Sequence, residues 1–170
     1  VCEWVGVHTD VSEIRMAEHR LRRLAELLEQ RVHERTVERD RMWRVADDLL
    51  GVIQGQRWLS RNPAWGRTLG WDDEELRHQP PTSLEHPDDP PVFPRLAALR
   101  HGEVLSDLPG RLRTRDGAWR HMMWKATADH DGRIYVFGRD VTVEHDAALA
   151  LQNAEAALRQ AQKMEAIGHL

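Results

Sequence analysis

Hydrophobic residues recur at intervals of three and four near the start of the chain. From Ser12 to Val45 the sequence contains neither proline nor glycine. The apolar positions of the repeat are Ile14, Ala17, Leu21, Leu24 and Leu28. This spacing places them along one side of a helix, while Glu and Arg fill many of the other positions. A helix over residues 12–45 would be roughly 50 Å long, which favours a coiled-coil linker over a helix packed on its own domain.

The same spacing returns after Thr142. It involves Ala147, Leu151, Ala154, Leu158 and Ala161. We therefore expect a second long helix over residues 143–170, and two helical seams through which the chain pairs with a second copy. The expected dimer-interface residues are Leu21, Leu24, Leu28, Leu151 and Leu158.

Between these helices the pattern changes to short alternating runs with many turn residues, which predicts a globular domain over residues 46–142. Two short strands, 49–53 and 57–60, are expected around a turn at Gly55. Three longer strands, 104–115, 118–128 and 133–141, are separated by Asp116-Gly117 and Asp131-Gly132. Both dipeptides are strong hairpin-turn signals. The predicted fold class is α+β, a five-stranded antiparallel sheet with short helices on one side, flanked by long N- and C-terminal coiled-coil helices.

Short helices are expected between the second and third strands. Asn62-Pro63 predicts a helix start, with Asn62 as the N-cap and Pro63 in the first helical position, and Gly70 predicts its end. A second helix is expected from Asp72 to His78, and a third that includes Phe93, Leu96 and Leu99 and ends at Gly102. The acidic run at residues 72–75 suits the positive end of a helix dipole, so we assign no metal site to it.

Composition excludes several classes of protein. A formal net charge of −4 offers no basic patch of the size that nucleic-acid binding needs, so we expect no nucleic-acid partner. No apolar run is long enough to span a membrane. We expect the segment to lie in the cytoplasm, and a membrane anchor elsewhere in the parent protein is left open. The single cysteine, Cys2, cannot form an internal disulfide.

The two helical segments share a junction sequence. Asp10-Val11-Ser12 and Asp140-Val141-Thr142 are offset by 130 residues, and the same offset relates Ala17/Ala147, Leu21/Leu151 and Leu28/Leu158. Strand-like residues precede each junction. Residues 1–11 are therefore predicted to be the last strand of a preceding domain of the same kind.

The globular segment resembles the PAS family over most of residues 44–145. The residues that carry the resemblance are Asn62-Pro63-Ala64-Trp65 with Leu69-Gly70-Trp71, His86-Pro87-Asp88-Asp89, Asp116-Gly117-Ala118-Trp119-Arg120 and Gly138-Arg139-Asp140-Val141-Thr142. The resemblance implies a sensory or dimerisation domain that passes a conformational change into the following helix. Asp140 and Thr142 are the expected signal junction, since either side chain could cap that helix.

The last residues, Gln162 to Leu170, resemble the start of the dimerisation and phosphoacceptor helix of sensor histidine kinases. In that family the phosphorylated histidine lies further along, so His169 is not assigned that role. The ATP-binding domain of the family does not follow within this sequence, so we assign no catalytic residues. The resemblance implies that the parent protein is a histidine kinase, with the kinase domain as a partner in the same chain and a response regulator as a partner of the parent.

Candidate ligand-binding residues are aromatic. Trp65, Trp71, Phe93, Trp124 and Tyr135 could line a pocket, although core packing explains them equally well. Strand alternation places Met122, Trp124 and Ala126 on one face of the sheet and Trp119, His121 and Met123 on the other, without saying which face is inward.

No cofactor is identified from the sequence. His86 and His101 are poorly placed for haem, and residues 44–145 contain no cysteine for flavin photochemistry. The favoured function is a PAS module that relays a signal through a parallel homodimer to a kinase. The alternatives are a sensor that feeds a cyclic-dinucleotide synthase, a purely structural dimerisation module, and an independent ligand-binding or enzymatic domain.

Overall fold

A computed structural model describes residues 11–55 and 57–168 of the chain. The chain divides into two units, one ending at Met42 and the other beginning at Trp43, which are described separately. The first unit contains most of helix α1 (Val11–Val45), as the apolar spacing predicts. The strand expected for residues 1–11 lies almost entirely outside the described residues. In the described part of the chain no helix has the length and hydropathy needed to cross a membrane.

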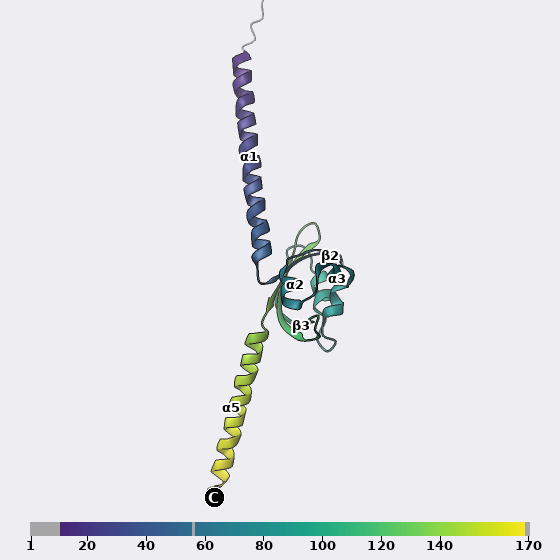
Figure 1. Cartoon of the computed structure of the whole chain (residues 1–170), viewed down its shortest axis with the longest axis vertical. Helices are drawn as coiled ribbons and strands as arrows, with labels where there is room; N and C mark the ends of the chain where they lie inside the picture. The colour runs from purple at the N-terminus through teal and green to yellow at the C-terminus, as the bar shows by residue number, and fades with distance from the viewer. Residues whose placement is uncertain (1–10, 56, 169–170) are drawn as a thin grey trace, which may run out of the picture. The chain divides into compact units, whose positions relative to one another are not determined.

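The second unit contains the sheet, the short helices and the long helix α5 (Thr142–Gly168) (Figure 1). The strands are β1 (Leu49–Gln54), β2 (Arg57–Arg61), β3 (Val104–Arg113), β4 (Trp119–Ala128) and β5 (Arg133–Asp140). Their order across the sheet is β2-β1-β5-β4-β3, and every neighbouring pair is antiparallel. The predicted fold class is therefore confirmed for the sheet and for the two long helices. The central position of β5 joins the early hairpin to the later strands.

The turns between the strands follow the predicted chemistry. Gly55, Gly117 and Gly132 all have positive φ values, of 62°, 90° and 72°. Such angles are accessible to glycine at little steric cost, which explains why these tight connections use it. Strand β3 contains an irregularity between Leu105 and Leu108, where Asp107 also has a positive φ of 55°.

Four short helical segments connect β2 to β3. They are α2 (Ala64–Leu69), α3 (Asp73–His78), the 3-10 turn η1 (Pro81–Leu84) and α4 (Val92–Ala97). Helix α4 ends at Ala97, before the predicted end at Gly102. Asp72 caps α3 in a reciprocal capping box with Glu75, in agreement with the acidic start predicted there. Gly70 ends α2 in the left-handed conformation, also as predicted.

The predicted capping role of Asn62 is wrong. The N-cap of α2 is Pro63, and among the described residues no side chain caps this helix. The buried Asn62 amide instead accepts a hydrogen bond from the Leu50 backbone N–H at 2.9 Å and donates one to the Asp48 carbonyl at 2.9 Å. It therefore ties the end of β2 to the start of β1. Asn62 bonds to the backbone at the start of β1 instead of capping α2, because both the oxygen and the nitrogen of a buried amide need hydrogen-bond partners.

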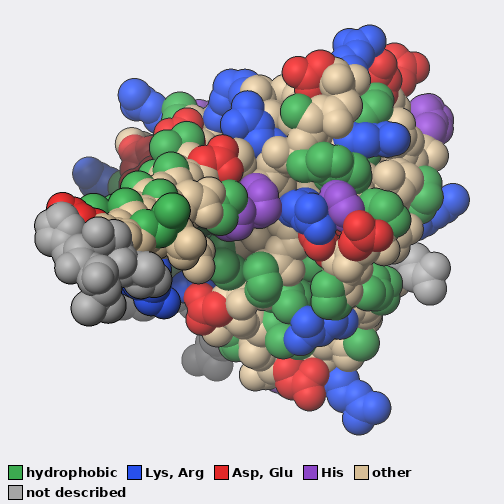
Figure 2. Space-filling view, turned by 90° about the horizontal axis from the view of Figure 1, so that it is seen from below, with side chains coloured by type: hydrophobic (Ala, Val, Ile, Leu, Met, Phe, Trp, Pro, Cys, Tyr) green, Lys and Arg blue, Asp and Glu red, His purple; other side chains and the backbone are tan. Residues whose placement is uncertain are grey.

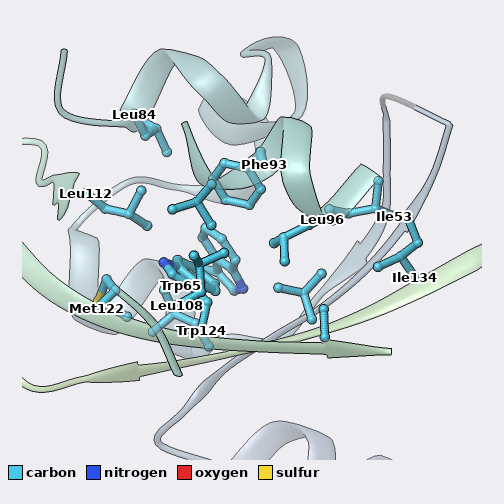
Figure 3. Close-up of a cluster of buried hydrophobic side chains, with 14 of the residues drawn as sticks. Ile53, Trp65, Leu84, Phe93, Leu96, Leu108, Leu112, Met122, Trp124 and Ile134 are labelled. Carbon is cyan, nitrogen blue, oxygen red and sulfur yellow. The ribbon is translucent and has the colours of Figure 1, made fainter. Parts of the chain in front are cut away.

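The core lies between the inner face of the sheet and the short helices (Figure 3). Met122, Trp124 and Ala126 of β4 are buried in it, which resolves the choice of face that the sequence left open. The opposite face of β4 carries His121 and Met123, and both are half-buried. Burial of this aromatic and aliphatic cluster is the main source of stability for the domain.

Candidate signal junction and aromatic core

The junction between β5 and α5 is held by side-chain hydrogen bonds. One oxygen of the Asp140 carboxylate accepts the Thr142 backbone N–H at 2.9 Å and the Thr142 hydroxyl at 2.5 Å. Asp140 thus satisfies an amide in the first turn of α5, as an N-terminal cap does. The Nη1 atom of Arg120 on β4 lies 3.7 Å from the other Asp140 oxygen.

His121 connects this junction to β4. Its backbone N–H donates to the Thr142 hydroxyl oxygen at 2.9 Å, and its carbonyl accepts the Val141 N–H at 2.8 Å. Both polar backbone groups of one β4 residue are therefore used to hold the start of α5. The helix start is attached to two neighbouring strands rather than only to the strand that precedes it in sequence.

The His121 side chain also meets α5. Its imidazole ring stacks on that of His145, with ring centroids 3.7 Å apart and planes 13° apart. Burial lowers the pKa of His121, and the nearby His145 and Arg111 lower it further. A lowered pKa keeps the His121 ring neutral at pH 7, which suits close parallel stacking because two protonated rings would repel each other. Histidine side chains are visible beside charged groups on the face drawn in Figure 2.

The His86-Pro87-Asp88-Asp89 motif closes the loop between η1 and α4 onto β3. The Arg111 guanidinium forms a two-pronged ion pair with Asp89, and the Arg111 backbone N–H also donates to that carboxylate at 2.9 Å. The Arg111 hydrogen bonds hold the pKa of Asp89 below its ordinary value. His86 donates its backbone N–H to the Arg111 carbonyl, and its ring centroid lies 4.4 Å from that of Trp119. His86 therefore has a structural position in this turn.

Three of the five candidate pocket residues meet in the core. Trp65, Phe93 and Trp124 are 2%, 3% and 0% exposed, so they form packed interior rather than the wall of an open cavity. Trp124 lies 5.4 Å from Phe93 and 5.9 Å from Trp65 between ring centroids. Figure 3 shows Phe93 between the short helices and the two indoles. Edge-to-face and tilted aromatic pairs at such distances stabilise a core.

The other two candidates lie elsewhere. Trp71 is partly buried at the margin of the core and donates its indole N–H to the Arg113 carbonyl at 3.0 Å. Tyr135 lies on the outer face of β5, between the inward-facing Ile134 and Val136, and its hydroxyl donates to Asp129. The five residues therefore do not share one pocket.

A shallow groove of about 510 Å³ lies beside Phe93 at the domain surface. It is lined largely by aliphatic and proline side chains, including Ile53, Pro80, Pro94 and Ala97. It presents few groups that could orient a polar ligand. Within the described residues, the aromatic core and this groove therefore provide no set of converging polar side chains of the kind that fixes a small molecule.

The predicted interface leucines are exposed in the single chain. The exposed fractions are 66% for Leu21, 54% for Leu24, 56% for Leu28, 62% for Leu151 and 59% for Leu158. Large aliphatic side chains at helical spacing along exposed helices are typical of surfaces that pair with another helix.

The sequence predicted Asp140 and Thr142 as the junction, and the structure brings their side chains into contact, but their neighbours His121 and His145 were missed. The sequence offered only weak evidence for these two residues. His121 falls on the face of its strand opposite Trp124, and His145 follows Thr142 by about one helical turn. Only the pairing of β4 with β5, in which Met122 lies opposite Asp140, brings the two histidines together.

Comparison with known proteins identifies the fold of the globular domain. The family described as the PAS fold matches residues 59–138. Similar solved structures include the PAS domain of an HTR-like protein from Haloarcula marismortui. That structure is 18% identical, with a TM-score of 0.58, and the match covers 68% of this chain and 98% of that one.

Two further structures are described as sensory box histidine kinase/response regulator proteins or a domain of one. The one from Geobacter sulfurreducens has 20% identity and a TM-score of 0.54, with coverage of 64% of this chain and 96% of that one. The one from Burkholderia thailandensis has 25% identity and a TM-score of 0.51, with coverage of 68% and 92%. A search of curated proteins found no match. The fold and these comparisons agree on one architecture for the domain.

Proposed function

We propose that this PAS sensory domain belongs to a two-component sensor histidine kinase and relays a signal through a parallel homodimer to the kinase. The fold match and the neighbours from sensor histidine kinases support the sensory role. The resemblance of residues 162–170 to the start of a phosphoacceptor helix supports the kinase output. In this proposal the kinase domain follows in the same chain, and a response regulator receives the phosphoryl group.

The observation that carries the proposal is the attachment of α5 to two strands. Asp140 holds the first turn of α5 from β5, and the His121 backbone holds Thr142 and Val141 from β4. A change in the relative position of these strands would therefore alter the direction or rotation of α5. The signal is then a shift between two helix arrangements, and it requires a stimulus that interacts differently with each.

Helix pairing supplies the dimer in this mechanism. Leu151 and Leu158 are both more than half exposed and lie seven residues apart on α5. A second α5 in parallel would cover both side chains in each copy, which gains hydrophobic stabilisation and fixes the register. A rotation of the paired helices would then be transmitted along their length.

The input in this proposal arrives through α1 rather than through a ligand in the aromatic core. Arg67 on α2 donates to the carbonyls of Arg44 and Ala46, at 3.3 Å and 2.7 Å, and so attaches the end of α1 to the domain. The packed positions of Trp65 and Trp124 favour relay over capture of a ligand at that place.

The proposal is tested in the intact parent protein by measuring incorporation of phosphate from ATP. Asp140→Ala should change the basal phosphorylation rate, because it releases the first turn of α5. Asp131→Ala, in an exposed turn at the other end of β5, is the matched control and should behave like the wild type. If the parent protein produced a cyclic dinucleotide instead, the domain would be a sensor that feeds a cyclic-dinucleotide synthase. If Asp140→Ala left the kinase activity unchanged, the domain would be a purely structural dimerisation module.

A further inference from the structure

Three potential metal ligands converge at the junction between β4 and α5. One ligand atom from each of His121, His145 and Asp146 lies within 4.8 Å of the others. His121 comes from the outer face of β4, and the other two come from the N-terminal part of α5. His145 Nδ1 lies 3.5 Å from an Asp146 carboxylate oxygen.

The chemistry of these groups suits a divalent transition metal. Two imidazoles and one carboxylate are a common three-ligand set for zinc, in which water fills the fourth position. The carboxylate supplies negative charge that offsets part of the charge on the metal. Arg111, a cation that acts on His121 from the adjoining strand, is itself paired with Asp89, which reduces its repulsion of a bound metal.

At least one imidazole must turn out of the stack to bind an ion shared with the other, because the lone pair of an imidazole lies in its ring plane and the His121 and His145 planes are only 13° apart. Two atoms that each lie about 2.1 Å from the same ion can be at most about 4.2 Å apart. The three ligand atoms here lie within 4.8 Å of one another, so they must come closer together to share an ion. His145 and Asp146 have side chains that are 46% and 67% exposed, so both can change rotamer without disturbing the core. The His121 backbone is fixed by its junction hydrogen bonds, which gives the site one rigid side.

We propose that His121, His145 and Asp146 form a binding site for a divalent transition-metal ion, with zinc as the reference ion, that bridges β4 to the N-terminal part of α5. Binding would cross-link the sheet to the helix beside the Asp140 and Thr142 hydrogen bonds. The ion would therefore restrain the segment through which the domain transmits its signal. This site is separate from the aromatic core and does not depend on a ligand there.

Zinc titration of the 170-residue chain by calorimetry tests the site. The wild type should show one tight binding event for each chain. His145→Gln and Asp146→Asn change exposed helix positions and should preserve folding, while each weakens that event by at least about tenfold. His121→Gln should do the same. The matched control is His130→Gln, whose side chain is 77% exposed in the turn between β4 and β5, and it should bind like the wild type.

Hydrogen exchange provides a second readout that does not depend on affinity. Zinc should slow exchange of the backbone amides in the first turns of α5 in the wild type, and a chelator should reverse the effect. His145→Gln should show no such protection. Unchanged tight binding in both His121→Gln and His145→Gln, or zinc protection that persists in His145→Gln, would overturn the proposal.

Discussion

The indole ring of Trp124 lies against Gly138 on the neighbouring strand, with no room for a side chain between them. The two residues are directly opposite in the pairing of β4 with β5. A Cβ atom added at position 138 would lie 2.7 Å from Cη2 and 2.8 Å from Cε3 of the ring. Glycine at this position therefore lets the largest buried side chain of β4 lie across the sheet.

Gly138→Ala should destabilise the domain by about 1–3 kcal/mol, because the overlap falls on a fully buried ring with no space to retreat. Gly51→Ala is the matched comparison. A Cβ there would overlap Trp58, but that ring is only partly buried, at an edge strand, and can shift. Chemical denaturation of both variants measures the difference. An equal loss of stability would show that the buried position of Trp124 does not decide the cost.

Asn62→Ala should also lower stability, by about 1–3 kcal/mol, because two backbone groups lose the hydrogen bonds that the buried Asn62 amide makes to them. These groups are the Leu50 N–H and the Asp48 carbonyl. The matched control is Asn153→Ala on the exposed surface of α5, which should leave the unfolding midpoint of the domain unchanged. Chemical denaturation followed by tryptophan fluorescence measures both midpoints. A wild-type midpoint for Asn62→Ala would mean that water replaces both bonds at no cost.

Asp89→Asn should remove a pH-dependent part of the stability. The pKa of Asp89 is lowered in the folded protein by Arg111, so ionised Asp89 stabilises the fold above its unfolded pKa, which is about 3.9. That contribution disappears as the pH falls through the lowered folded pKa. The variant should therefore melt below the wild type at pH 7, and the gap should narrow in strong acid. Thermal unfolding at several pH values measures the difference in melting temperature between the variant and the wild type. A difference that does not vary with pH would contradict this explanation.

Leu151→Asp combined with Leu158→Asp should abolish self-association of the 170-residue chain, because each substitution would bury an unpaired carboxylate in the proposed helix seam. Gln152→Asp with Gln160→Asp adds the same charge on the same helix away from the proposed seam and should leave dimers intact. Native mass spectrometry distinguishes monomer from dimer. Dimers that persist in the leucine variant would exclude Leu151 and Leu158 from the interface.

Features that depend on near neighbours in the chain could be predicted from the sequence alone. Apolar spacing predicted α1 and α5, alternation predicted the strands, and Asp-Gly pairs predicted the hairpin turns, because each pattern reflects the local geometry of a helix, strand or turn. The contact between Asp140 and Thr142 could be anticipated for the same reason. They are two residues apart, and their hydrogen bonds are local.

Contacts between distant residues were settled only by how the whole chain packs. Asn62 resembled a helix cap, but the backbone at the start of β1 offered it better hydrogen-bond partners. Alternation placed Trp124 and His121 on opposite faces of one strand, and only packing of the short helices made the Trp124 face the interior. His121 meets His145 because β4 pairs with β5 beside the start of α5. Such contacts depend on strand order and burial, which no local pattern encodes.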